Sequence, residues 1–419
     1  MSRTCQFAFA DRSGPAEWSF DEVSLVVAPA DGRPLVFPVQ EMAGVAGDGY
    51  TLVLAIPGPA APAVTGEAGG AGGAPAAPAA PGAATPAPPA AQTASPLLSL
   101  SRLGAEGPTL LDALQRTWLA ARAKALRLGG SGEGKPFSGM VSGIDGTGGG
   151  AAVPCRALLF EDVMVMAREG RDLDPVFVAL IEKIAFDEDT HAIRITEWPG
   201  REIVLSKLGK QTEDFLGWLR KHREALSNES GAILASAVPS LSSAYRGILA
   251  GDWPPGRLRT LQDLGTICPG FEQAFRSVWL AACVRKDEGQ FLLDWAGPAS
   301  CWLGCSRETG EGGEGLLWLL AEKNGLWFLE ALTGEDRATY YFSAGSRMPA
   351  LVSRLLCAPQ FSKEALYGPP EMLTGERADL AIAAQFLGFL AELRALFRGR
   401  VIHTSLESWQ KDMGAAAGS

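Results

Sequence analysis

One short motif occurs twice in this chain, and its two copies decide the fold. Residues 100–104 read Leu-Ser-Arg-Leu-Gly, and residues 205–209 read Leu-Ser-Lys-Leu-Gly. Upstream of each copy lies a run of Phe, two acidic residues and Val, at residues 20–23 and 160–163. The same order of motifs in both places predicts that the chain contains an internal repeat.

The repeat makes specific matches between the two copies. Phe20 is expected to occupy the same position as Phe160, and Leu103 the same position as Leu208. Each Leu-Ser-(Arg/Lys)-Leu-Gly motif opens a stretch with the apolar spacing of an amphipathic helix. Both helices carry a Trp-Leu pair, at residues 118–119 and 218–219, which supports the same matching.

The two copies differ in length because of one unusual segment. Phe20 and Leu100 are 80 residues apart, whereas Phe160 and Leu205 are 45 residues apart. The difference is about the length of residues 57–96, which consist almost entirely of Ala, Pro, Gly and Thr. Such a segment cannot bury enough apolar surface to offset its ordering entropy. We therefore expect a disordered insertion inside the first domain, with residues 97–100 returning as a strand of the sheet built by residues 1–56.

The second copy shows the pattern of the repeated unit most clearly. Its short apolar or alternating runs are separated by Gly, Pro and acidic turn residues, as in an antiparallel meander. The runs are residues 137–141, 155–160, 163–167, 176–186, 192–197 and 202–205. One amphipathic helix follows from Thr212 to about Leu226, with acidic residues in its first turn that favour the positive end of the helix dipole.

Six or seven antiparallel strands followed by one helix resemble the pleckstrin-homology-like fold. The Leu-Ser-(Arg/Lys)-Leu-Gly motif also looks like that of uncharacterised bacterial proteins with tandem domains of this type. The resemblance implies an α+β, mainly antiparallel architecture of tandem, partly open barrels, each closed by a C-terminal helix, with the first barrel split by the Ala/Pro/Gly insertion. It covers residues 1 to about 228 without the insertion, and it says little about activity, because such domains share architecture more than function.

Three regions are therefore expected: a split domain at 1–128, a second domain at 136–228 and an α+β region at 240–419. In the third region, apolar runs flank Asn324 and Gly325, a strong hairpin signal. A third, diverged copy over residues 285–357 is consistent with this pattern. Further expected elements are helices at 269–285, 347–357, 376–398 and 405–413, and strands at 290–303.

Composition excludes several classes of protein. The chain has 419 residues and a formal net charge of -10, so specific nucleic-acid binding, which needs a concentrated basic face, is not expected. The first residues lack a secretory pattern, and no stretch approaches the roughly 20 apolar residues of a membrane span. Seven Cys are too few and too scattered for a disulfide framework, which indicates a reducing cytoplasm.

Three stretches imitate known sites. Residues 129–135 fit Gly-x4-Gly-Lys, but a helix is expected before them and Pro136 replaces the hydroxyl residue that a phosphate-binding loop requires. Cys301 and Cys305, with Cys268 and Cys283 upstream, form only one loose pair, whereas structural zinc sites favour two tight pairs. Residues 187–191 combine acids with His191 but lack the glycine and terminal Glu of a calcium loop. We interpret these stretches as a linker, buried apolar side chains and a solvated turn.

The sequence therefore predicts a non-enzymatic, cytoplasmic binding or scaffold protein that engages a polypeptide partner, with no catalytic residue, cofactor or metal ligand. The surplus acidity favours a basic partner. The alternative is a module for anionic lipid headgroups, although residues 143–150, at the loop that binds phosphates in lipid-binding members, contain no Lys or Arg. The candidate partner-binding residues are Arg220, Lys221 and Arg223 on the helix and Asp187, Glu188 and Asp189 in the turn.

Overall fold

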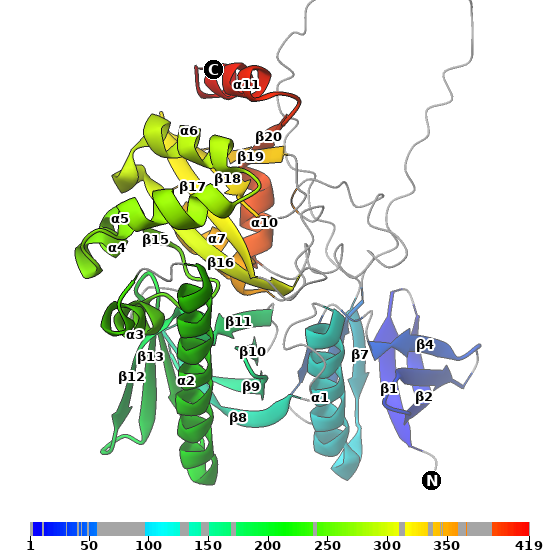
Figure 1. Ribbon diagram of the computed structural model, residues 1–419. Helices are drawn as coiled ribbons and strands as arrows, with labels where there is room; N and C mark the ends of the chain where they lie inside the picture. The colour runs from blue at the N-terminus through cyan, green and yellow to red at the C-terminus, as the bar shows by residue number, and fades with distance from the viewer. Residues whose placement is uncertain are drawn as a thin grey trace, which may run out of the picture. The chain divides into compact units, whose positions relative to one another are not determined.

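The computed structural model is an α+β structure built mainly from antiparallel sheets (Figure 1). It describes residues 3–10, 12–30, 32–39, 42, 44–47, 50–56, 97–125, 134–143, 151–168, 173–237, 241–309, 315–333, 338–343, 345, 347–358, 366 and 388–418. The expected insertion at 57–96 lies outside these residues. The chain divides into two compact units, Met1–Trp118 and Leu119–Ser419, which we describe separately.

The first unit contains one seven-stranded antiparallel sheet, sheet A, in the order β4-β3-β2-β1-β7-β6-β5. Its strands are β1 Thr4–Phe9, β2 Arg12–Phe20, β3 Ser24–Pro29, β4 Leu35–Pro38, β5 Gly44–Gly47, β6 Thr51–Ala55 and β7 Leu97–Ser101. β7 pairs with both β1 and β6, so the chain beyond the segment 57–96 returns to the same sheet. This confirms the strand predicted at residues 97–100.

Sheet A is completed by helix α1, Gly107–Ala125. The strands of sheet A alternate buried residues with more exposed ones, as in β6, where Leu52 and Leu54 are buried. From α1, Leu110, Leu114 and Trp118 are buried, at the helical spacing of one apolar face. The indole N–H of Trp118 donates to the carbonyl oxygen of Met42 at 2.8 Å, which ties the helix to the chain just before β5.

The second unit begins its folded part with sheet B, whose order is β11-β10-β9-β8-β14-β13-β12. Its strands are β8 Lys135–Ser142, β9 Val153–Leu159, β10 Val163–Arg168, β11 Leu173–Phe177, β12 Ile181–Asp187, β13 Ala192–Glu197 and β14 Arg201–Ser206, with the short helix η3, Val178–Leu180, before β12. Helix α2, Thr212–Ala237, follows, and its Phe215, Leu216 and Leu219 join the core of this sheet. Sheets A and B therefore have the same strand connectivity, and each is followed by a helix.

The repeated motif has the same backbone conformation in both copies. Arg102 and Lys207 have φ angles of 59° and 56°, and Gly104 and Gly209 have φ angles of 65° and 58°. The left-handed region is uncommon for a side chain as long as Arg or Lys, so its occurrence twice at the same motif position is strong evidence for the repeat. A short 3-10 turn, η2 Gly104–Glu106 or η4 Gly209–Gln211, then leads into the helix.

The match of Leu103 with Leu208 is confirmed, whereas the match of Phe20 with Phe160 is wrong by one residue. Both leucines are 6% exposed and begin the same short turn. In sheet A the hairpin is closed by the N–H of Asp21 on the carbonyl oxygen of Ser24, but in sheet B by the N–H of Phe160 on that of Val163. Phe160 therefore corresponds to Asp21. The run of Phe, two acidic residues and Val is shifted by one residue between the two turns.

The Trp-Leu pairs are not equivalent either. Counted from the Gly of each motif, Leu110 corresponds to Phe215 and Leu114 to Leu219, and all four side chains are buried. Trp118 lies one turn further along its helix. The matching that the sequence suggested for the helices was therefore a coincidence of composition, while the apolar spacing itself was correct.

The rest of the second unit is built around sheet C, whose strands follow one another in chain order, β15-β16-β17-β18-β19-β20. They are β15 Arg259–Thr260, β16 Cys301–Thr309, β17 Gly315–Lys323, β18 Leu326–Ala331, β19 Ala338–Phe342 and β20 Phe397–Ile402. The helices are α3 Ser243–Asp252, α4 Leu261–Ile267, α5 Phe271–Ala274, the π-helix η5 Phe275–Leu280, α6 Lys286–Ala296, η6 Pro298–Ser300, α7 Met348–Cys357, α10 Gly388–Leu396 and α11 Leu406–Gly418.

Sheet C corrects three expectations. Its order differs from that of sheets A and B, so the region 285–357 does not share the connectivity of the repeat. The first half of the strand pattern at 290–303 belongs to α6, and strand structure begins only at Cys301. The helix expected to run to Arg398 ends at Leu396, because β20 pairs with β19 and Gly399 lies against the Tyr341 ring, where a Cβ would come within 2.8 Å of its hydroxyl oxygen. Most of the predicted segment 376–398 lies outside the described residues.

A buried polar cluster lies within the otherwise apolar core of sheet C. The Nε2 atom of His403 is 3.2 Å from Oε2 of Glu330 and 3.0 Å from Oγ1 of Thr339. The Thr339 hydroxyl donates to Glu330 and accepts from the indole N–H of Trp409, which anchors helix α11 in the core. Glu288 approaches the other ring nitrogen of His403 at 3.9 Å. Burial raises the pKa of Glu330, and the neighbouring imidazole opposes this effect only in part.

This cluster makes the stability of the protein depend on pH in a predictable direction. A carboxyl group whose pKa is raised by folding favours folding fully below its ordinary pKa of about 4.3, and this contribution is lost as pH rises through the raised value. We expect Glu330→Gln to become progressively more stable than the wild type, in free energy of unfolding, between about pH 4.5 and pH 8. Urea unfolding of both proteins across that range measures the difference, and two parallel pH profiles would contradict the assignment.

Candidate partner-binding surfaces

The structure places the six predicted partner-binding residues on two separate elements of the second unit. Arg220 and Lys221 are exposed on α2, where Arg223 is half-buried, and the three acidic residues are exposed in the turn between β12 and β13. No hydrogen bond or ion pair joins the basic set to the acidic set. The six side chains are therefore not assembled into a single site.

The acidic turn has a structural role of its own. Oδ1 of Asp187 accepts the backbone N–H groups of Asp189 at 3.0 Å and Thr190 at 3.1 Å, which lowers the pKa of Asp187. Asp21 makes the same type of turn between β2 and β3, and its pKa is lowered in the same way. His191 ends the turn with a φ of 50° and is exposed. In the described part of the chain, the exposed side chains of Glu188 and Asp189 make no hydrogen bond or ion pair.

The cysteines are not arranged for reactivity. All seven are buried and none forms a disulfide, and burial raises the pKa of Cys5 and Cys283 to about 11 and of Cys301 and Cys305 to about 12. A thiol acts as a nucleophile or metal ligand only as the thiolate, which such burial disfavours. Among the described residues, no group of three His, Cys, Asp or Glu could hold a metal ion.

The two glycine-rich stretches lie mostly outside the described residues. Residues 126–133 and 144–150 are not described, and β8 begins at Lys135, with Pro136 as its second residue. A strand thus follows the Gly-x4-Gly-Lys sequence, where a phosphate-binding loop would need a helix. Within the described ranges, no helix is long and apolar enough to cross a membrane.

Sequence reasoning missed a second apolar face on sheet B. Besides the face that packs on α2, strands β9 to β11 bury the side chains of the opposite face. We call this set the sheet B face: Leu158, Val163, Val165, Pro175 and Phe177. The signal was present in β10, where Val163, Met164, Val165 and Met166 form a continuous apolar run instead of an alternation, as expected for a strand that is buried on both sides.

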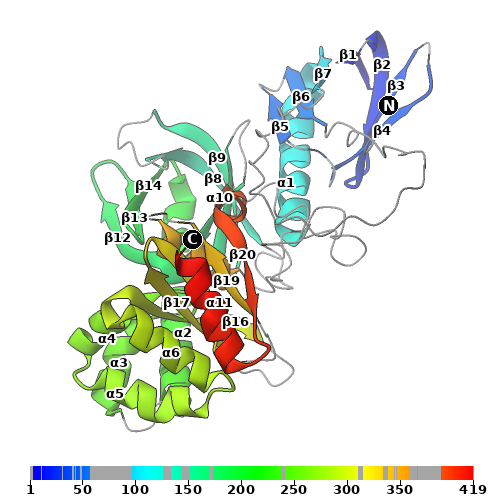
Figure 2. The same ribbon diagram turned by 90° about the horizontal axis from the view of Figure 1, so that it is seen from above.

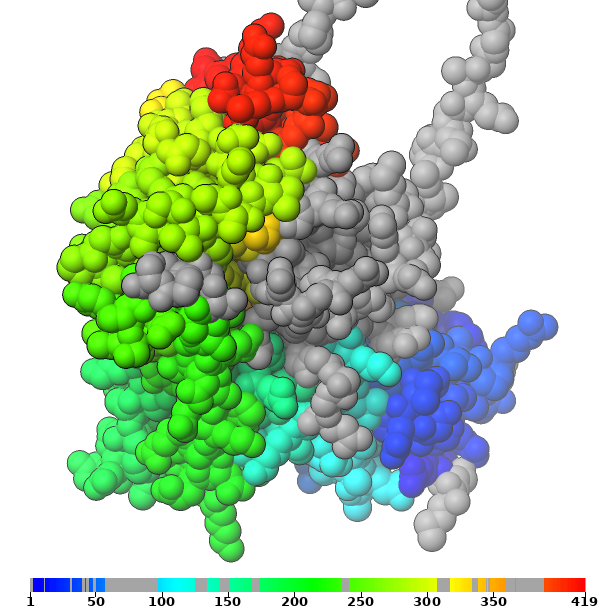
Figure 3. All heavy atoms as spheres, in the orientation of Figure 1, coloured from blue at the N-terminus to red at the C-terminus, as the bar shows by residue number. Residues whose placement is uncertain are grey.

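The sheet B face is covered by helices from the C-terminal part of the chain. The ring of Phe389 in α10 packs edge-on against Phe177, with ring centroids 6.3 Å apart. Helix α7 contacts η3, the turn that follows β11. In the ribbon views α10 lies beside α7, above the strands of sheet B in the orientation of Figure 1 (Figures 1 and 2). The space-filling view shows the green and yellow-green segments of the second unit, α2 to α6, in contact with one another (Figure 3). This domain therefore already binds a helical segment through its sheet.

A buried ion network closes the rim of this interface. Glu197, at the end of β13, is fully buried, and its Oε2 accepts from Arg354 of α7 at 2.5 Å and from Arg201 at 2.8 Å. Arg201 also pairs with Asp174 of β11. Burial raises the pKa of Glu197, and the two guanidinium groups counteract that rise. Because a buried carboxylate without a cation is costly, the network holds α7 in a defined position on sheet B.

The buried segment 253–258 makes a second connection between sheet B and sheet C. The indole N–H of Trp253 donates to the carbonyl oxygen of Leu303, and the N–H of Gly256 donates to that of Cys305. Gly256 has a φ of +92°, and a Cβ there would lie 2.3 Å from Sγ of Cys357, so only glycine fits. This close packing directs Arg257 to Glu182 on β12, with its guanidinium carbon 5.9 Å from the ring of Trp198.

Removing the cation that α7 supplies tests this interface. We expect Arg354→Ala to lower the free energy of unfolding by about 3–5 kcal/mol, because the buried carboxylate of Glu197 then keeps only one of its two arginine partners, Arg201. The matched control is Arg194→Ala, which breaks an ion pair with Glu202 that is about half exposed and should cost less than about 1 kcal/mol. Urea unfolding measures both variants, and equal losses would show that the buried network contributes no more than a surface pair.

The corresponding face of sheet A is only partly covered within the described residues. Strand register in the two sheets matches the sheet B face with Ser19, Ser24, Val26, Val36 and Pro38, which we call the sheet A face. Val36 is 58% exposed, while its counterpart Pro175 is buried. Val23, in the adjoining turn, is 67% exposed. At the positions that the second unit covers, the first unit therefore leaves Val36 exposed and Val26 and Pro38 half-buried, while Val23 corresponds to the buried Asp162 and lies beside the face.

The edges of both sheets are protected against strand addition. The N–H of Val39 donates to the carbonyl oxygen of Val23 in the neighbouring chain segment. Backbone groups alternate in direction along a strand, so those of Val36 and Pro38 point away from β3, and proline has no N–H to donate. By the same alternation, the backbone groups of Pro175 in β11 point away from β10. At the other edges, Gln115 of α1 donates to the carbonyl of Val45 in β5, and β12 carries Glu182, Lys183 and a bulge. The faces, and not the edges, are the surfaces left for a partner.

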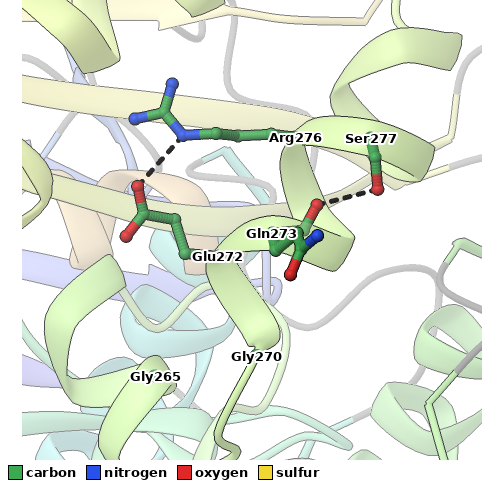
Figure 4. A pocket seen from close by; sticks show the side chains of 6 residues that line it. All are labelled: Gly265, Gly270, Glu272, Gln273, Arg276 and Ser277. Carbon is green, nitrogen blue, oxygen red and sulfur yellow. Dashed lines mark hydrogen bonds and ion pairs between the residues drawn. The ribbon is translucent and has the colours of Figure 1, made fainter.

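A shallow polar hollow lies along α5 and the π-helix η5. Its volume is about 640 Å³, and its lining residues are Gly265, Gly270, Glu272, Gln273, Arg276 and Ser277 (Figure 4). Insertions of the π type often occur at functional sites. Here, however, Arg276 donates to Glu272 and to Asp294, each at 3.0 Å, so its charge is already neutralised by the protein.

Comparison with known proteins gives no family for this chain. No family model matches it, and no curated protein matches it.

Proposed function

We propose that this protein is a non-enzymatic, cytoplasmic binding or scaffold protein that uses two pleckstrin-homology-like domains to hold polypeptides. The strand order 4-3-2-1-7-6-5, present twice and each time followed by a helix with a buried apolar face, supports the fold assignment. In this reading α1 and α2 are the helices that close the two barrels. Seven buried cysteines without a disulfide fit a reducing compartment.

The observation that carries the proposal is the covered face of sheet B. There the domain binds α10 through Phe177 and α7 through Glu197, so it acts as a docking platform for another part of the chain. The first domain has the same connectivity, and on its matching face Val36 is 58% exposed while Val26 and Pro38 are half-buried. A fold used for docking in one copy and left open in the other is best explained by a partner that binds the open copy.

Charge gives the partner a secondary preference. The net charge of -10 and the exposed carboxylates of Glu188 and Asp189 favour approach by a basic polypeptide, through an attraction that weakens with salt. The exposed Arg220 and Lys221 are the residues through which an anionic lipid surface would bind instead. The experiment must therefore separate proteins from lipids.

The full-length protein, immobilised, is presented with vesicles of phosphatidylcholine containing 0 or about 30% phosphatidylserine, and separately with lysate proteins at low and high salt. We expect at least one protein, identified by mass spectrometry and then purified, to bind the chain directly with a defined stoichiometry in calorimetry. Binding to the anionic vesicles alone, lost in Arg220→Glu/Lys221→Glu, would replace the proposal with lipid binding. Turnover of a nucleotide or ester by the purified protein would make it an enzyme.

A further inference from the structure

We infer that the sheet A face binds an amphipathic helix of another polypeptide, through an apolar stripe that carries no charge. The inference rests on the proposed function and specifies both the site and the chemistry of the partner. It is drawn from a comparison of equivalent positions in the two sheets, since the structure shows in sheet B what the same positions do when they are occupied.

Strand register allows the faces of sheets A and B to be compared residue by residue. In sheet B, Val163 lies opposite Phe177 and Val165 opposite Pro175. In sheet A, Ser24 lies opposite Pro38 and Val26 opposite Val36, at the same distance from the closing turn. Across the next pair of strands, Ser19 opposite Val26 matches Leu158 opposite Val165. The two faces are thus the same surface of the same fold.

The exposure of these positions differs sharply between the two copies. Val165 and Pro175 are buried in sheet B, whereas their counterparts in sheet A differ: Val26 is half-buried and Val36 is 58% exposed. Exposed apolar side chains clustered on one face mark an interaction site more often than isolated ones do. The apolar side chains of the sheet A face are Val26, Val36 and Pro38, bordered by Ser19 and Ser24, and Val23, 67% exposed, lies in the adjoining turn.

The occupant is a helix and not a strand. In sheet B the ring that packs on this face comes from α10. A strand could reach sheet A only through its edges, and Pro38 removes a donor from β4 while Gln115 occupies a carbonyl of β5. The small side chains of Ser19 and Ser24 also leave room for the close approach of a helix.

The stripe that contacts the face is uncharged, because sheet A has lost the ionic rim. By the same register, Asp174 of sheet B corresponds to Leu35, and Glu197 corresponds to Ile56. An arginine placed on the partner as Arg354 is placed on α7 would therefore meet an aliphatic side chain and be desolvated without a counter-ion. The partner differs in this respect from the chain's own C-terminal helices, which makes the two docking faces selective for different segments.

The probe is a phage-displayed library of helical peptides, selected against the full-length protein. Selected peptides are expected to be helical when bound, to share an apolar stripe and to lose at least tenfold in affinity on Val36→Glu. The matched control, Val284→Glu, places the same charge at a position that is 69% exposed in the second unit and should leave affinity unchanged. Because Val36 is mostly exposed, both variants should keep the wild-type circular dichroism spectrum and thermal midpoint.

The outcomes separate the inference from the proposed function. A purified protein partner that binds Val36→Glu as tightly as the wild type would overturn the inference and leave the proposed function standing. Peptides that bind in an extended form, or that all require a basic residue within the apolar stripe, would overturn it as well. If sedimentation shows that the wild type self-associates and Val36→Glu does not, the occupant is a second copy of this chain, and the helix assignment is wrong.

Discussion

The second unit depends on one constraint: sheet B is apolar on both faces, so both faces must be covered. One face is covered by α2, which is part of the same repeat, and the other is covered by helices that come later in the chain. An uncovered face of this size would expose Val163, Val165 and Phe177 to water, each at a cost of about 1.5–3 kcal/mol. The position of α7 and α10, the ion network at Glu197 and the tight turn at Gly256 all follow from that requirement.

The polar groups at this interface define its geometry more than they add to its stability. A buried ion pair gains little net free energy over apolar packing, but it is strongly destabilising when one partner is absent. Glu197, held by Arg201 and Arg354, therefore permits only one arrangement of α7 on the sheet. Sheet A lacks these charges, and its face is smaller and more polar, which fits a surface that is stable when free and can still bind a partner.

Much of the fold could be predicted from the sequence, because the repeat fixes local structure. The Leu-Ser-(Arg/Lys)-Leu-Gly motif, the strand that returns as β7 and the Asn324-Gly325 hairpin were all correctly identified. The register of Phe160 and the helix α6 in place of the strand expected from residue 290 were not, because similar residues can occupy a turn in two registers and tertiary packing of Leu292 and Leu293 can override a strand-like pattern. The docking face was missed, since it depends on contacts between segments about 200 residues apart, although the unbroken apolar run of β10 pointed to it.

The central claim is that sheet B and the C-terminal region form one cooperative body through the covered face. Native-state hydrogen exchange of the full chain, followed by mass spectrometry at increasing urea, tests it most directly. The account predicts that the most protected amides of β10 and of β17 to β18 exchange through one opening, with the same free energy and the same dependence on urea. Amides of β10 that exchange in a separate, less costly opening, while β17 and β18 remain protected, would contradict it.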